Sequence, residues 1–273
     1  MELLLFSSSY LANIKTHFIQ LLIEALKVVL GKILMTDIHA LIAAAGRGTR
    51  SGLPYPKTLY PVNGTPILIR ILDQLMLFDQ SPTIIASPSG EAPIKQCLEK
   101  NNRKAYIVIQ EEPLGMGNAV LQFEKSPIAN AAKNILLVWG DIPFLEKKTL
   151  STLIQTHFSK GNSFTFVSRF VDSAYTIVSR DSKGKVVDVL ETREQNSKPQ
   201  QGERDIGLFI FNKSDIFNLL TQNLPGKFGK FTSEHGFLYL IRHLVARNYP
   251  VDALPIATKR ELISLNKLSD LML

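Results

Sequence analysis

The sequence is poor in cysteine: among its 273 residues only Cys97 carries a thiol. One cysteine cannot form a disulfide within the chain or build a cysteine-ligated zinc site. We therefore expect a protein of a reducing, cytoplasmic compartment.

Runs of like charge are lacking as well, since the 31 Lys and Arg residues are scattered along a chain of net charge +7. This balance favours small phosphorylated ligands, and we expect no nucleic-acid partner.

A long uninterrupted hydrophobic run is also missing. Residues 1–34 place apolar side chains at helical spacing, but charges such as Lys15, Glu24 and Lys27 interrupt them. A membrane span needs about 20 apolar residues, and a signal peptide needs a basic start and a cleavage site, so we expect neither. Three interpretations stay open: an amphipathic helix packed on the domain, a helix in peripheral contact with a membrane surface, or a dispensable extension before a true start at Met35.

From Ile38 onward, short apolar runs alternate with helical stretches. The pattern predicts strands over 39–45, 82–87, 105–110 and 134–141, and helices over 65–78, 92–101, 117–126 and 147–159. Strand-like segments at 163–170, 174–180, 185–191 and 206–212 predict a mixed or antiparallel extension, before helices at 213–223 and 236–248. We therefore predict an α/β fold, a single Rossmann-like domain over residues 35–273 with a mixed, mainly parallel sheet flanked by helices.

The loop after the first strand, "AAAGRGTRSGLPYPK" (43–57), combines glycines with cations. Glycines allow backbone amides to converge on a phosphate. A dinucleotide fingerprint needs a glycine or alanine where Ser51 stands, and a Walker loop needs Gly-Lys-Ser/Thr in place of Ser-Gly-Leu at 51–53. Neither fits. Arg50 can clamp phosphate oxygens and Lys57 can supply a point charge, which suits a triphosphate; the alternative is a surface loop with solvated cations.

This motif resembles the signature of the sugar-1-phosphate nucleotidyltransferases, Leu-Ala-Ala-Gly-x-Gly-Thr-Arg followed by Pro-Lys. Further segments resemble that family in the same order: "QEEPLGMGNAV" (110–120), "LLVWGDIPFL" (136–145), "KGKVVDVLE" (183–191), "ERDIGLFIF" (203–211) and "ELISLNKLSDL" (261–271). The closest resemblance is to the uridyltransferase domain that makes UDP-N-acetylglucosamine. It implies a GT-A-like nucleotidyltransferase fold. It also implies a Mg²⁺-dependent reaction in which an NTP, here UTP, and a sugar-1-phosphate give an NDP-sugar and pyrophosphate.

The resemblance also implies roles for particular residues. Arg50 and Lys57 would be catalytic, stabilising the reacting phosphates. Glu191 and Asp205 would bind the sugar. The nucleotide-binding residues would be Ala44, Ala45, Gly46, Gly48, Thr49, Gln110 and Gly115. Gln110 could read the edge of a pyrimidine, and Gly115 and Gly117 would let the chain pass close to the base.

Asp141 and Asn266 are the predicted metal ligands. Asp141 follows the strongest strand, at the edge where open α/β sheets place their ligands, and Mg²⁺ prefers oxygen donors. Each site residue also has a plain structural alternative: a helix cap for Asp141, a cap or surface group for Asn266, a solvated turn residue for Gln110 and an exposed strand end for Glu191.

Three departures from the family pattern affect the substrate pocket. Met116 stands where the uridyltransferases carry Thr, Asp205 stands where they carry Asn, and "AYTI" (174–177) replaces a Gly-Tyr-Gly turn. A carboxylate in place of an amide changes the hydrogen bonds available to a sugar. Two other functions therefore stay open: transfer to a non-sugar phosphate such as phosphocholine, and a catalytically weak nucleotide or sugar-nucleotide binding protein. A homo-oligomer is also left open.

Overall fold

The computed structural model describes residues 37–46, 52–195, 198–266 and 268–271. Its contacts divide the chain into residues 1–37 and residues 38–273, and the second unit is the one described below. The predicted N-terminal amphipathic helix or dispensable extension, residues 1–34, and the predicted site residues Gly48, Thr49 and Arg50 lie outside the described residues. In the part of the chain that is described, no helix is long and apolar enough to cross a membrane.

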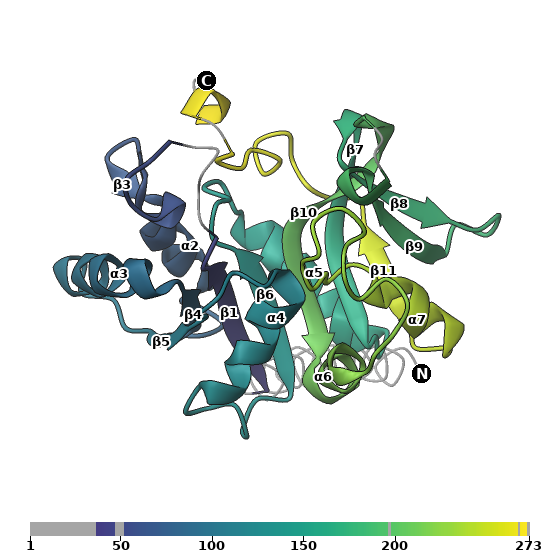
Figure 1. Cartoon of the computed structure of the whole chain (residues 1–273), viewed down its shortest axis with the longest axis horizontal. Helices are drawn as coiled ribbons and strands as arrows, with labels where there is room; N and C mark the ends of the chain where they lie inside the picture. Colours follow the sequence, from purple (N-terminus) through teal and green to yellow (C-terminus); the bar gives the residue numbers. More distant parts are fainter. Residues whose placement is uncertain (1–36, 47–51, 196–197, 267, 272–273) are drawn as a thin grey trace, which may run out of the picture. The chain divides into compact units, whose positions relative to one another are not determined.

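A seven-stranded sheet, ordered β11–β7–β10–β6–β1–β4–β5, forms the centre of the unit (Figure 1). Its strands are β1 (Ile38–Ala44), β4 (Thr83–Ala86), β5 (Tyr106–Ile109), β6 (Asn134–Trp139), β7 (Phe164–Ala174), β10 (Gln200–Asn212) and β11 (Val251–Leu254). Within this sheet only β10 runs antiparallel to its neighbours, β6 and β7, and the other pairs are parallel. The predicted mixed, mainly parallel sheet is confirmed.

The sheet is buried on both faces, which is why its strands are nearly continuous apolar runs. In β1, Ala40 and Ile42 face one core while Leu41 faces the other, and all three are fully buried. The first core packs against α2 (Ile67–Leu75), α3 (Pro88–Lys100) and α5 (Lys147–Ser159). The second packs against α4 (Met116–Leu121), α6 (Lys213–Thr221) and α7 (Leu240–Ala246).

Shorter elements complete the described part of the chain. They are the 3-10 turns η2 (Lys57–Leu59), η3 (Gln122–Lys125), η4 (Thr192–Gln195) and η5 (Leu268–Leu271), and two antiparallel pairs, β2 (Pro61–Val62) with β3 (Thr65–Pro66) and β8 (Thr176–Arg180) with β9 (Val186–Glu191). The β8–β9 pair is a sheet of its own, so only β7 and β10 extend the main sheet as predicted.

Two further details differ from the sequence prediction. The strand β11 was not expected, because its four residues include the carboxylate of Asp252, which pairs with Lys160 on the surface. The helix α7 begins at Leu240 rather than at Gly236, because residues 237–239 form a bend and turn. Both differences arise in short segments where local contacts override the hydrophobic pattern.

The strand order changes direction between β1 and β6, and this positions the site. The chain leaves β1 toward α2 on one face of the sheet, whereas it enters β6 from α4 on the other face. The loops that follow β1 and β6 start side by side, because the two strands are parallel neighbours and their carboxyl ends are adjacent. In open α/β sheets this point is where a ligand crevice forms.

Candidate active site

The side chains of Lys57 and Asp141 meet at this point. The Lys57 ammonium donates a hydrogen bond from Nζ to Oδ2 of Asp141 at 2.7 Å. Their side chains are only 18% and 17% exposed, so the ion pair is largely shielded from water. The structure thus brings together the predicted phosphate-binding lysine and a predicted metal ligand, across 84 positions of sequence.

Two local features place these residues. Lys57 opens the 3-10 turn η2, which follows Pro56 and is closed by a backbone hydrogen bond from Tyr60 N to Lys57 O at 3.0 Å. Asp141 follows Gly140, whose N–H donates to the carbonyl of Ala43 at 2.9 Å. A Cβ on residue 140 would lie only 2.9 Å from that same oxygen, so a glycine is needed for β6 to end directly against β1.

The described part of the phosphate loop begins as predicted from the end of β1. Ala44 and Ala45 are buried, whereas Gly46 is exposed and has open space around the position of a Cβ. The chain therefore leaves the core at Gly46, beside the strand end that contacts Gly140. Contact of these three residues with a nucleotide stays a prediction.

The C-terminal segment, residues 258–266, runs to the same edge and is yellow in Figure 1. Leu265 N donates to the backbone carbonyl of Asp141 at 2.9 Å, so Asn266 is attached next to the metal-ligand candidate. The Asn266 side chain donates from Nδ2 to Ser264 Oγ at 3.0 Å, and its backbone N donates to Asp270 Oδ2 at 2.9 Å. Neither bond uses the amide oxygen of Asn266.

Glu261 anchors this segment, and sequence reasoning missed it. Its side chain is only 1% exposed and accepts hydrogen bonds from Thr149 Oγ1 at 3.0 Å, Glu146 N at 3.1 Å and Thr258 N at 2.9 Å. A buried carboxylate satisfied by three donors ties the segment to the start of α5. The spacing of Thr258 and Glu261 is a capping-box pattern, a signal that the sequence does contain.

Three of the five buried side-chain atoms that have no hydrogen-bond partner among the described residues lie on the segments that carry Lys57 and Asp141. Among the described residues, Thr58 Oγ1, Trp139 Nε1 and Asp141 Oδ1 are buried and have no hydrogen-bond partner. A buried carboxylate oxygen without a donor is costly unless something absent from the chain itself satisfies it. The described residues contain no cluster of three or more His, Cys, Asp or Glu side chains that could hold a metal by themselves. A metal ion at Asp141 would thus need ligands beyond the His, Cys, Asp and Glu side chains of the described residues.

The predicted nucleotide residues lie around the start of α4. Gln110 is 5% exposed and donates from Nε2 to Asn118 Oδ1 at 2.8 Å and to Gly115 O at 3.2 Å. Gly115 has φ of 103°, and a Cβ there would lie 2.5 Å from the carbonyl oxygen of His235. At Gly117 a Cβ would lie 2.1 Å from the carbonyl oxygen of Gly236. The close approach that these glycines allow is thus to the 235–236 backbone, and contact with a base stays a prediction.

The two predicted sugar ligands differ in the hydrogen bonds that their carboxylates make within the protein. Glu191 ends β9, and its carboxylate accepts from Arg193 Nε at 2.9 Å; burial raises the pKa of Glu191, although the charge of Arg193 opposes this. Asp205 is only 1% exposed, and both its oxygens are occupied, by Thr176 Oγ1 at 2.6 Å and Gly207 N at 3.0 Å. Burial raises the pKa of Asp205. The Asp205 carboxylate therefore lies beneath the surface, where it orders the β8–β10 contact.

Tyr175 and Arg204 are a second feature that sequence reasoning missed. The Arg204 guanidinium lies 4.2 Å from the centroid of the Tyr175 ring, and Arg204 is 9% exposed. Burial raises the pKa of Tyr175; the charge of Arg204 opposes this effect, and the charges of Asp205 and Asp141 act in the same direction as burial. The substitution of "AYTI" for the family turn was the only signal in the sequence.

The fold and this site define the class of protein: an α/β domain in which a lysine that follows β1 and a carboxylate that follows β6 meet where the strand order reverses. Residues 40–202 match the model of the MobA-like NTP transferase domain, which is more than half of the chain. The chain belongs to this family.

Curated relatives match most of this chain. The bifunctional protein GlmU of Listeria innocua serovar 6a is 29% identical over 201 residues, which is 71% of this chain and 43% of that protein. The bifunctional protein GlmU of Leifsonia xyli subsp. xyli is 28% identical over 232 residues, which is 82% of this chain and 46% of that protein. The chain thus spans less than half the length of these curated relatives.

Solved structures share the fold. A UDP-glucose pyrophosphorylase complexed with UDP-glucose has a TM-score of 0.63 at 19% identity, covering 79% of this chain and 89% of the other. A putative glucose-1-phosphate thymidylyltransferase from Bacillus anthracis in complex with a sucrose has a TM-score of 0.64 at 15% identity, covering 80% and 87%. The single α/β nucleotidyltransferase fold is thereby confirmed.

Proposed function

We propose that this chain is a Mg²⁺-dependent nucleotidyltransferase that joins UTP and a sugar-1-phosphate to give a UDP-sugar and pyrophosphate. The observation that carries the proposal is the contact between Lys57 Nζ and Asp141 Oδ2 at 2.7 Å, at the carboxyl ends of β1 and β6. A cation and a carboxylate at this point of the sheet are what the alignment of two phosphate groups requires. The family match and the relatives named GlmU support a sugar phosphate as the acceptor.

The residues present fit a magnesium ion. Asp141 Oδ1 is buried without a hydrogen-bond donor among the described residues, and the Asn266 amide oxygen is left unused by the bonds of its own side chain. Both are the hard oxygen donors that Mg²⁺ prefers, and this ion usually keeps water and phosphate oxygens in its other positions. When bound, the ion would neutralise phosphate charge and hold the phosphate oxygens in line.

The chain's own groups would bind and orient the two anions. Lys57 would exchange its contact with Asp141 for the phosphates when a nucleotide enters, so the negative charge that builds at phosphorus meets a fixed cation. The exposed glycine at 46 begins a loop in which backbone amides can approach the triphosphate. The phosphate oxygen of the acceptor is itself the nucleophile; it attacks the α-phosphorus and pyrophosphate leaves, so no protein nucleophile is required.

The sugar side is the part of the proposal with the most room for variation. Glu191 ends β9 with a carboxylate that can accept a hydrogen bond from a sugar hydroxyl, and Arg193 holds it in place. The buried Asp205 stands where the family's amide is expected and uses both oxygens within the protein. We therefore propose that Glu191 contacts the acceptor directly, while Asp205 positions the strand beside it.

The experiment is an assay of pyrophosphate release with each of the four nucleoside triphosphates against a panel of sugar-1-phosphates and phosphocholine, with and without Mg²⁺. The proposal expects Mg²⁺-dependent turnover with UTP and at least one sugar phosphate. Turnover with phosphocholine alone would support a non-sugar acceptor. Nucleotide binding by calorimetry without turnover on any acceptor would instead support a binding protein.

A further inference from the structure

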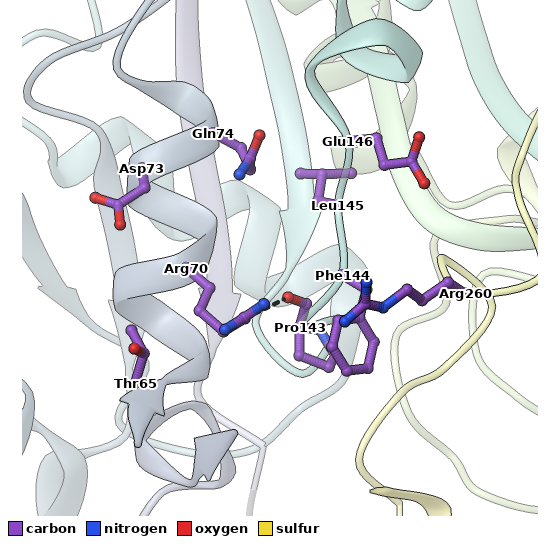
Figure 2. A pocket seen from close by; sticks show the side chains of 9 residues that line it. All are labelled: Thr65, Arg70, Asp73, Gln74, Pro143, Phe144, Leu145, Glu146 and Arg260. Carbon is purple, nitrogen blue, oxygen red and sulfur yellow. Dashed lines mark hydrogen bonds between the residues drawn. The ribbon is translucent and has the colours of Figure 1, made fainter. Parts of the chain in front are cut away.

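A cavity of about 300 Å³ lies away from the Lys57–Asp141 contact, between α2 and the segment 143–146 (Figure 2). Its wall is formed by residues of α2, by the loop that follows β6 and by Arg260 of the C-terminal segment. Neither Lys57 nor Asp141 lines it. The volume is at the lower end of the range for small-molecule sites in proteins.

Two guanidinium groups face this cavity across one aromatic ring. The guanidinium carbon of Arg260 lies 4.4 Å from the centroid of the Phe144 ring, and that of Arg70 lies 5.4 Å from it. Arg70 is also held by hydrogen bonds from Nε to Pro143 O at 3.0 Å and from Nη1 to Val62 O at 3.4 Å. Phe144 thus lies within cation–π distance of both cations without neutralising them.

Each carboxylate of the cavity wall has one oxygen held by a donor of the protein. Asp73 accepts two hydrogen bonds from Arg103, with the shorter from Nη2 at 2.6 Å, and Glu146 Oε1 accepts from Thr258 Oγ1 at 3.0 Å. Figure 2 shows the two guanidinium groups converging on Phe144, while the Asp73 and Glu146 carboxylates point away from that ring. Arg260 forms no hydrogen bond or ion pair through its guanidinium with any described residue. Its donors are therefore available to a ligand.

We propose that this cavity is a second ligand site, distinct from the nucleotide site, and that it binds a small anion carrying a phosphate or carboxylate group between Arg70 and Arg260. A planar guanidinium offers paired donors that match either group. Gln74 and Thr65, which also line the cavity, can hydrogen-bond the polar remainder of the ligand. The site does not depend on the reaction proposed above, because its residues are separate.

The test is isothermal titration of the full chain, without divalent metal, with inorganic phosphate and with succinate as two separate probes. The wild type is expected to bind at least one of them, and the probe that binds identifies the anionic group. Arg260→Met is expected to weaken binding about tenfold or more, since it removes a charge-assisted hydrogen bond. Arg260→Lys, which keeps the charge, should recover part of the loss.

Two variants separate this cavity from the other anion site. Lys259→Met removes an exposed neighbouring cation that does not line the cavity and should bind like the wild type. Lys57→Met disables the proposed nucleotide site and should also bind like the wild type. The proposal is overturned if neither probe binds the wild type, if Arg260→Met binds unchanged, or if Lys57→Met alone abolishes binding.

Discussion

The backbone N–H of Leu265 donates a hydrogen bond to the backbone carbonyl of Asp141, with an N–O distance of 2.9 Å. This bond joins the loop after β6 to the C-terminal segment next to Asp141. It places Asn266, the second proposed metal ligand, one residue from the contact. The proposed metal site therefore depends on two segments that are remote in the sequence.

We expect Asp141→Asn to lower kcat by about 100-fold or more, because it removes the charge that would hold the cation beside the phosphates. The side chain keeps its size, so the melting temperature should change little. Pyrophosphate release and thermal unfolding measure the two effects. Asp172→Asn, at an exposed position, is the matched control. An Asp141→Asn enzyme with wild-type kcat would contradict the metal assignment.

We expect Lys57→Met to lower kcat/KM for the nucleotide by about 100-fold, since the aliphatic stem remains but the cation is lost. Lys57→Arg keeps a charge of different shape and should lose less. Steady-state kinetics with varied nucleotide concentration checks this. Lys104→Met serves as the control, since Lys104 is exposed. Equal losses in the control and at position 57 would mean that only net charge matters.

The structure leaves no space for the methyl group of an alanine at position 117. Its Cβ would lie 2.1 Å from Gly236 O and 2.7 Å from His235 Cδ2, so the two loops must separate. We expect Gly117→Ala to reduce the free energy of unfolding by about 1–3 kcal/mol, measured by urea denaturation. The control is Gly236→Ala, where the nearest atom lies at 3.5 Å and little change is expected. Similar losses in both variants would contradict this explanation.

The pair of His39 and Asp79 predicts a pH dependence of stability. Burial alone would raise the pKa of Asp79, but the hydrogen bond from His39 at 2.8 Å, the charge of that ring and the N–H groups of Ala40 and Ser81 lower it. The stabilisation is thus complete above the unfolded pKa of about 3.9 and is lost as pH falls through the lower folded value.

Asp79→Asn should accordingly reduce the free energy of unfolding at pH 7 by about 1–3 kcal/mol. The gap to the wild type should close as the pH falls below 4. Urea denaturation across pH 3 to 7 measures both curves. A gap that stays constant over this range would show that packing, rather than ionisation, accounts for the loss.

The buried Asp205 predicts the opposite pH dependence, in which the free energy of unfolding falls as the pH rises. Burial raises its folded pKa, so the native state binds a proton more readily than the unfolded chain, and ionisation costs stability above the folded pKa. Asp205→Asn should leave the protein at least as stable at neutral pH, because an amide can still serve Thr176 and Gly207. The variant should lose the gain in stability that the wild type shows on mild acidification. Calorimetric melting at several pH values would detect it.

The sequence predicted the core of the fold because the parallel strands are buried on both sides. The run over 134–141 appears as β6, and the helix over 147–159 appears as α5 with the same bounds. The hydrophobic pattern was less informative where polar contacts determine which strands pair. The β8–β9 pair forms its own sheet, since β8 and β9 pair with each other over five positions of register.

The sequence predicted those site residues whose chemical type and position at the end of a strand together indicate their role. Asp141 follows β6 and meets Lys57 because both strand ends are adjacent, which an α/β pattern implies. Glu261 and the Arg204–Tyr175 contact were not predictable in this way. The capping-box spacing indicates Thr258 as one partner of Glu261, but Thr149 and Glu146 lie far away in the sequence, as does Tyr175 from Arg204, and the local pattern does not indicate them.

The antiparallel direction of β10 has a consequence for how this domain can diversify. Because β10 runs against its neighbours, its early residues reach the edge where β1 and β6 finish, and the β8–β9 hairpin that precedes it stands outside the main sheet. The hairpin takes no part in the β1–β6 pairing that supports Lys57 and Asp141, and it is tied to β10 through Thr176 and Arg180. Under the proposed function, we expect variation between acceptors to fall on this hairpin, while the residues proposed to bind the phosphates stay the same.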